Sequence, residues 1–147
     1  MKLSRVLLDG DSFDEKLGES SIAKLENSKK WLIRCNNCRI LIERRGNRYH
    51  TKHDVSIYNT AEQSYRHVVI WNHFLQRFMQ RTHCSTEQAW YRICLLLIYG
   101  DSRFSKVLNR QYIKGDDKYS FVLAYDMTED GILIYKTFFI KDNKHCV

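Results

Sequence analysis

The residues with the most specific chemistry are two cysteines followed by two histidines. Cys35 and Cys38 are separated by two residues, and His50 and His53 follow with the same spacing. Two Cys thiolates with two His nitrogens are a common tetrahedral ligand set for structural zinc, and the short gap lets both sulfurs reach one ion from a tight turn. The sequence therefore predicts zinc as a cofactor, bound by Cys35, Cys38, His50 and His53.

Strand geometry places a condition on this zinc site. The two pairs lie on segments that read as the two strands of one hairpin, in which His50 is five residues along the strand from Cys38. That separation is ~17 Å at ~3.4 Å per residue, whereas a Zn–N bond is ~2 Å. The four-ligand site thus requires the second strand to leave the hairpin. Two alternatives stay open: other ligands, such as His83 or Cys84, complete a site at the cysteine pair, or the turn holds two thiols and no metal.

Positive charge is concentrated in the same part of the chain. The protein has 24 Lys and Arg against 17 Asp and Glu, a net charge of +7. Residues 29–52 hold eight basic residues and one acidic residue, Glu43, whereas both ends of the chain are mildly acidic. Such a local field attracts polyanions, and binding through phosphate contacts weakens as salt is raised. Aromatic residues make up 13% of the chain and offer rings on which unpaired bases can stack.

These observations predict a surface that binds DNA or RNA. Arginine predominates in it, and a planar guanidinium group can both pair with phosphate and stack on a base. Residues 29–52 form the centre of the expected surface, and basic residues of the following helical segment extend it. The residues expected to contact nucleic acid are Lys30, Arg34, Arg39, Arg44, Arg45, Arg48, Lys52, Arg66, Arg77 and Arg81.

Three functions are compatible with this composition. The first is a small, basic, non-enzymatic nucleic-acid-binding protein with a regulatory role. The second is a metal-independent ribonuclease of the small-toxin type, which needs a base, an acid and a cation near the phosphorus. For that reading the chain offers six histidines and four residues of its last hairpin, which are Tyr125, Tyr135, Lys136 and Thr137. The third is an inhibitor or immunity-type module whose basic face meets an acidic protein.

Length and composition limit the setting of the protein. A chain of 147 residues favours one domain, 1–147, with a sizeable core. The longest apolar run, 93–99, is far below the ~20 residues that a membrane-spanning helix needs, so we expect no membrane partner. Five cysteines, an odd number, and no evident secretory signal favour reduced thiols in the cytoplasm.

The spacing of apolar residues predicts three segments within that domain. A basic hairpin segment covers 29–58, a helical segment covers 61–114, and a C-terminal hairpin covers 118–140 with its turn at Asp130-Gly131. Because both strands of the last hairpin are apolar on both sides, we expect both faces to be covered. The fold class is therefore α+β, a mixed or antiparallel sheet with three to four helices and a C-terminal β-hairpin.

One helix carries start and stop signals of its own. Ser85 and Gln88 have the spacing of a capping box, and Gly100 is suited to end the helix that follows. That helix is apolar on almost all sides in its second half, which is typical of a buried helix. The helices expected from periodicity are 13–27, 61–82, 86–99 and 103–113.

Overall fold

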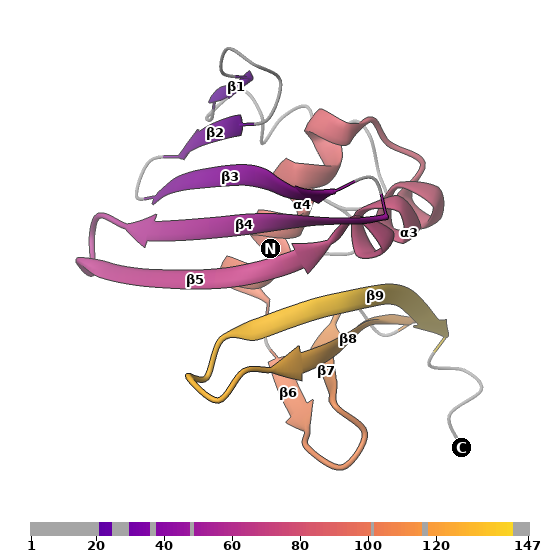
Figure 1. The fold of residues 1–147 in the computed structure, drawn as a ribbon. Coiled ribbons are helices and arrows are strands. Elements are labelled where there is room, and N and C mark those ends of the chain that lie inside the picture. Colours follow the sequence, from indigo (N-terminus) through magenta and orange to yellow (C-terminus); the bar gives the residue numbers. More distant parts are fainter. Residues whose placement is uncertain are drawn as a thin grey trace.

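The structure is a computed structural model that describes residues 21–24, 30–35, 38–47, 49–100, 102–115 and 118–142. Within these ranges the chain forms one nine-stranded mixed sheet and two helices, α3 and α4 (Figure 1). This result confirms the α+β class and the mixed sheet that the sequence predicts. The strand order across the sheet is β1-β2-β3-β4-β5-β9-β8-β7-β6.

Two antiparallel groups of strands make up the sheet. The first group comprises β1 (Ser21–Lys24), β2 (Lys30–Cys35), β3 (Cys38–Asn47), β4 (His50–Asn59) and β5 (Ser64–Trp71). The second group comprises β6 (Ser102–Ser105), β7 (Arg110–Lys114), β8 (Tyr119–Met127) and β9 (Leu133–Asp142). The groups join where β5 pairs in parallel with β9, with Val69 opposite Ile134. Strands β8 and β9 are the C-terminal hairpin expected from the sequence.

Helix α4 covers one face of the first group of strands, and α3 packs on α4 and on β9 of the second group. Helices α3 (Asn72–Thr82) and α4 (Thr86–Tyr99) connect β5 to β6, and α4 lies behind β3–β5 in Figure 1. Side chains of α4 share a buried cluster with Ile40 and Ile42 of β3 and Val55 of β4. We call this side of β2–β5 the inner face, and the opposite side the open face. No helix in the described part of the chain is long and apolar enough to span a bilayer.

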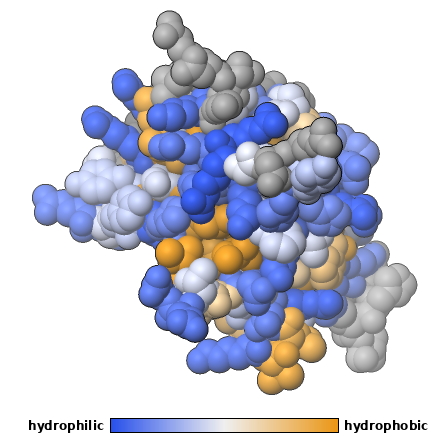
Figure 2. Space-filling view, in the orientation of Figure 1, coloured by the Kyte–Doolittle hydropathy of each residue, from blue (hydrophilic) through white to orange (hydrophobic). Residues whose placement is uncertain are grey.

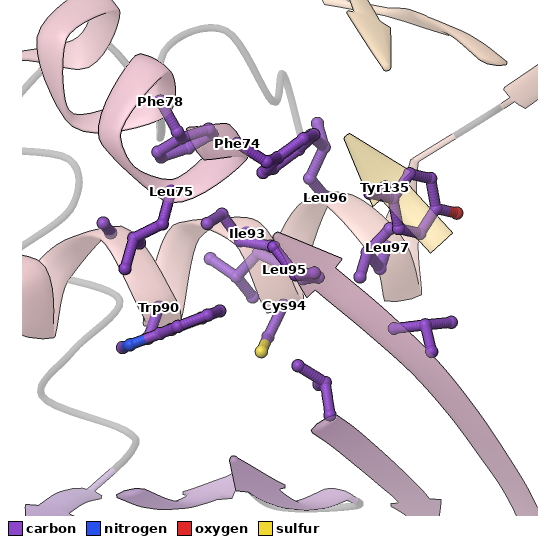
Figure 3. Packing of buried hydrophobic residues seen from close by; sticks show 14 of the residues in the cluster. Phe74, Leu75, Phe78, Trp90, Ile93, Cys94, Leu95, Leu96, Leu97 and Tyr135 are labelled. Atoms are coloured by element: carbon purple, nitrogen blue, oxygen red, sulfur yellow. The ribbon is translucent and has the colours of Figure 1, made fainter. Parts of the chain in front are cut away.

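Helix α4 forms the centre of the core. Every residue from Ala89 to Leu97 is buried, Arg92 among them, and the burial of Ile93 to Leu97 is what the apolar second half of this helix predicts. Figure 3 shows Trp90 and Cys94 on the side of α4 that faces the strands, while α3 packs on the other side. Phe74 of α3 meets Phe138 of β9 with ring centroids 5.6 Å apart. The same core therefore runs through both groups of strands.

The structure corrects the helix expected over 61–82. Its first part is strand β5, and α3 begins only at Asn72. The run Val68-Val69-Ile70 is β-branched and buried on both faces, which suits a central strand rather than an amphipathic helix. Short apolar runs of this kind fit both periodicities, so the helical spacing was a coincidence.

Two other predicted helices also differ from the structure. The segment 103–113 forms the antiparallel pair β6–β7 instead of a helix. Asn109 has φ +50° in the turn between them, and Gln111 and Ile113 are buried on alternate positions of β7. In the segment 13–27, residues 21–24 form β1 and the remainder lies outside the described residues. Two helices are thus described where three to four were expected.

The capping box at the start of α4 is confirmed and gives a stability test. Ser85 Oγ accepts a hydrogen bond from the Gln88 N–H at 3.3 Å, and Gln88 Oε1 accepts one from the Ser85 N–H at 3.3 Å. Ser85→Ala should lower the free energy of unfolding by about 1 kcal/mol, because one helix-end N–H loses its acceptor. Urea denaturation measures this change. Ser102→Ala on the exposed edge strand is the control and should stay within about 0.5 kcal/mol of the wild type; equal losses would contradict the capping role.

Candidate nucleic-acid interface

The register of β3 and β4 separates the predicted zinc ligands. Cys38 lies opposite Asn59, at the other end of β4 from His50, so the offset is nine residues or ~30 Å. His53 lies opposite Arg44, six residues from the partner of Cys38, or ~20 Å away. The structure therefore does not bring the cysteine pair and the histidine pair around one ion. The pairing of β3 with β4 differs from the expected pairing by four residues, because the turn of the hairpin comes after Asn47.

The cysteine pair itself is compact. Cys35 and Cys38 are directly opposite each other where β2 turns into β3. Among the described residues, no group of three or more His, Cys, Asp or Glu lies together so that it could hold a metal ion. Zinc at the cysteine pair, with ligands from elsewhere, stays a prediction.

Alternation along the strands divides the predicted basic residues between the two faces of the sheet. On β4, His53, Val55 and Ile57 are buried on the inner face, so the residues between them point to the open face. Register extends this assignment to the neighbouring strands. The basic residues that lie on the open face are Lys30, Arg34, Arg39, Arg45 and Lys52. Figure 2, drawn from this side, shows hydrophilic residues over most of the visible surface and an apolar area near the junction of β5 and β9.

One row of the open face combines arginines with tyrosines. Arg34 is directly opposite Arg39, Arg39 is opposite Tyr58, and Tyr58 is opposite Tyr65. Directly opposite side chains on adjacent strands are neighbours on one face. Tyr58 is 43% exposed and Tyr65 is 65% exposed. The row, which we call the Arg–Tyr row, therefore presents two guanidinium groups beside two solvent-facing rings.

A hydrogen bond from its hydroxyl group holds the ring of Tyr65 on this face. Its hydroxyl donates a hydrogen bond to Ser56 Oγ, 3.3 Å away on β4. Because Ser56 alternates with the buried Val55 and Ile57, this contact fixes the tyrosine above the open face. A ring held at both its backbone and its hydroxyl loses little freedom when another flat group packs on it.

A second cluster lies at the opposite end of the open face, around Trp71. Lys52 of β4 is directly opposite Trp71, and Lys136 Nζ lies 4.9 Å from the centre of the indole ring. His50 packs edge-on against the same indole, with ring centroids 4.7 Å apart. Lys136 also forms an ion pair with Asp126 at 2.6 Å. We call this group of His50, Lys52, Trp71 and Lys136 the Trp71 corner.

Acidic residues reduce the positive charge between these two clusters. Asp54 pairs with Arg45 at 2.6 Å and with His67 at 3.0 Å, all on the open face. On β2–β5 the open face carries five Lys and Arg residues against Glu43 and Asp54. Positive charge thus remains in excess, and it is greatest at the Arg–Tyr row, where β2–β5 contribute no carboxylate.

The other predicted contact residues do not share this face. Arg66 lies on the inner face and donates a hydrogen bond to the Leu97 carbonyl oxygen at 3.3 Å. Arg44 lies on the inner face as well, beside His53. Arg77 and Arg81 are exposed on α3, which packs against the inner side, and Arg48 lies outside the described residues. The expected continuation of the basic surface along a helix is therefore not found.

The inner face holds a groove that sequence reasoning missed. It has a volume of about 620 Å³ and lies between the ends of β2–β4 and the corner where α3 meets α4. Trp31, Trp90, Arg44 and His53 line it, together with Glu87. Trp31 and Trp90 come from distant parts of the chain, so no local pattern could have paired them. The groove opens on the opposite side of the sheet from the Arg–Tyr row.

His53 is buried in the wall of this groove. The residue is only 5% exposed, its Nε2 lies 3.2 Å from Asn72 Oδ1, and its ring packs edge-on against Trp90 at 4.8 Å. Burial lowers the pKa of His53 below the ordinary value of 6.5; the Asn72 hydrogen bond opposes this, Arg44 adds to it and Asp54 opposes it. His53 is therefore a neutral packing residue at pH 7.

The structure also revises the residues proposed for a ribonuclease. Tyr135 is fully buried and its hydroxyl donates to Gln111 Oε1 at 2.6 Å. Burial raises the pKa of Tyr135 to about 12, so the phenol stays protonated. Tyr125 is 7% exposed. Neither tyrosine can meet a substrate, and only Lys136 and Thr137 of that set are partly exposed.

Comparison with known proteins gives no relative: no family model matches the chain, and neither a curated protein nor a solved structure is significantly similar to it.

The lowered pKa of His53 predicts a loss of stability in acid. The unfolded chain takes up this proton below about pH 6.5 and the folded chain does not, so the free energy of unfolding should fall as pH is lowered from there. The slope from this one group is at most about 1.4 kcal/mol per pH unit. His53→Gln, which keeps an amide donor for Asn72, should flatten the curve in urea denaturation at a series of pH values. His73→Gln, at an exposed histidine, is the control; equal flattening there would contradict the assignment.

Proposed function

We propose that the protein binds single-stranded nucleic acid across the open face of β2–β5. The observation that carries this proposal is the Arg–Tyr row, in which two guanidinium groups stand beside two exposed rings on adjacent strands. Backbone phosphates would pair with the arginines while unpaired bases stack on the tyrosines, which is how sequence-tolerant single-strand binding works elsewhere.

A single strand fits this face better than a duplex. In a duplex the base faces are stacked on one another, and sequence is read by a helix or ribbon that enters a groove. The open face is a pleated surface, and its exposed rings can stack only on bases whose faces are not already stacked in a duplex. From Tyr58 to Lys52 along β4 the distance is ~20 Å, against a rise of ~3.4 Å per stacked base. Several nucleotides can therefore run from the Arg–Tyr row toward the Trp71 corner.

The tyrosines provide a direct test of stacking. Each ring–base stack is worth about 1–3 kcal/mol, so Tyr58→Ala with Tyr65→Ala should weaken binding of a short RNA or DNA strand by one to four orders of magnitude. Fluorescence anisotropy of labelled strands measures the affinity. Phe104→Ala is the control, because that ring is 45% exposed but lies on β6 in the other group of strands. Loss of affinity in the control alone would contradict the proposal that the strand binds on the open face.

The arginines provide a test of the electrostatic part. Arg34→Gln with Arg39→Gln removes two phosphate contacts. The slope of log K against log salt concentration should become shallower by ~1.4, since each contact with a single strand contributes ~0.7 to that slope. Arg77→Gln with Arg81→Gln makes the same change in net charge on α3 and should leave the slope unaltered. An equal reduction in both variants would mean that overall charge, rather than this row, sets the affinity.

The same titrations test the alternative of an acidic protein partner. A protein whose basic face is built for an acidic partner would bind RNA and DNA strands only at low salt, through non-specific charge attraction, and would keep its acidic partner at physiological salt. Capture of an acidic protein at physiological salt, with no binding of either strand at that salt, would overturn the nucleic-acid proposal.

A further inference from the structure

We infer that the pocket beside the Trp71 corner cleaves RNA, with His50 and His73 as the proton-transferring groups. The inference rests on the proposed function, because the strand must lie on the open face to reach this corner. It goes beyond binding by naming a reaction, a substrate class and two catalytic residues.

Two histidines from different elements line one pocket beside this corner. The pocket has a volume of about 220 Å³, and His50, His73 and Trp71 contribute to it. His50 is the first residue of β4, and His73 is the second residue of α3, directly after the junction with β5. Both histidines are exposed, so a ligand on the surface can meet both rings. The other lining residues are polar, among them Thr51, Asn72 and Gln76.

Two lysines lie at Trp71, which borders the pocket. Lys52 is directly opposite Trp71 on the adjacent strand, and Lys136 Nζ is 4.9 Å from the centre of its ring. Lys136 is ion-paired with Asp126 at 2.6 Å, which offsets its charge, so Lys52 supplies the net positive charge at this corner. A fixed positive charge beside the reacting phosphorus stabilises the negative charge that develops on its oxygens. The pocket and the adjoining Trp71 corner thus bring two imidazoles near two ammonium groups, one of them ion-paired, at the end of the path proposed for the strand.

The chemistry needs no metal and no second reactant, because RNA carries its own nucleophile. One imidazole accepts the proton of a 2′-hydroxyl as its oxygen forms a bond to the adjacent phosphorus. The other imidazole, in its protonated form, gives a proton to the 5′-oxygen as the P–O5′ bond breaks. The products are a 2′,3′-cyclic phosphate and a free 5′-hydroxyl, and one proton has been taken up and one released. Histidine suits both steps, since it is the side chain whose ordinary pKa lies nearest to neutral pH.

The experiment uses a labelled DNA strand that contains a single ribonucleotide. With the full chain in EDTA, cleavage should occur only after that ribonucleotide, and mass spectrometry should find a 2′,3′-cyclic phosphate end. His73→Ala and His50→Gln should each lower the rate by about 10²–10⁴-fold, the usual share of general acid–base catalysis. His83→Asn is the matched control, because His83 is an exposed histidine at the end of α3 with φ +52° that asparagine tolerates. It should cleave like the wild type.

Binding of a 2′-O-methyl RNA strand separates this inference from the proposed function, because that strand has no nucleophile. The wild type should bind this strand and leave it intact. Binding without cleavage by the wild type would overturn the inference and leave the binding function intact. Cleavage that survives both substitutions, or falls equally in His83→Asn, would also overturn it. Loss of both binding and cleavage in the wild type would overturn both proposals.

Discussion

Burial of one face of the first group of strands is the constraint on which the interface depends. Helix α4 is apolar on nearly all sides, and it buries the alternate residues Ile40, Ile42 and Val55 beneath it. Because side chains alternate along a strand, every residue between these is forced to the other side. A shift of one residue in β3 would bury Arg39 and Arg45 and expose Ile40 and Ile42. The same burial that holds the fold together therefore assembles the Arg–Tyr row and turns it toward solvent.

The Trp71 corner depends on a different constraint, the parallel pairing of β5 with β9. This pairing places Lys136 beside Trp71, although 65 positions of sequence separate them. The packing of Phe74 and Phe78 on Phe138 holds β9 against α3 at the same place. The two clusters of the open face thus have separate origins, one in the antiparallel register of β2–β5 and one in the contact between the two groups of strands. A binding role and a cleaving role can accordingly fail independently.

Local signals in the sequence predicted the parts of the fold that are locally determined. The Ser85–Gln88 capping box, the buried helix after it and the C-terminal hairpin depend on residues close together in the chain, and all three are present. The run around Val69 was misassigned because its neighbours across the sheet, and not its own periodicity, decide that it is a strand.

The candidate site could be predicted only in part for the same reason. The concentration of charge in residues 29–52 was visible, but which arginines share a face depends on register, and Arg44 lies on the opposite side from its neighbour Arg45. The histidine pair looked like a ligand set by spacing alone, whereas register places it far from Cys38. His50 beside Trp71 had no local signal, because strand pairing and not sequence proximity joins them.

The most direct test of the account is to map where a single strand touches the protein. Short RNA and DNA strands that carry a photoreactive thymine or uracil analogue would be crosslinked to the wild type, and the modified residues identified by mass spectrometry. The account predicts crosslinks at Tyr58 and Tyr65 on the open face. Crosslinks confined to the inner groove at Trp31 and Trp90, or to α3, would contradict it.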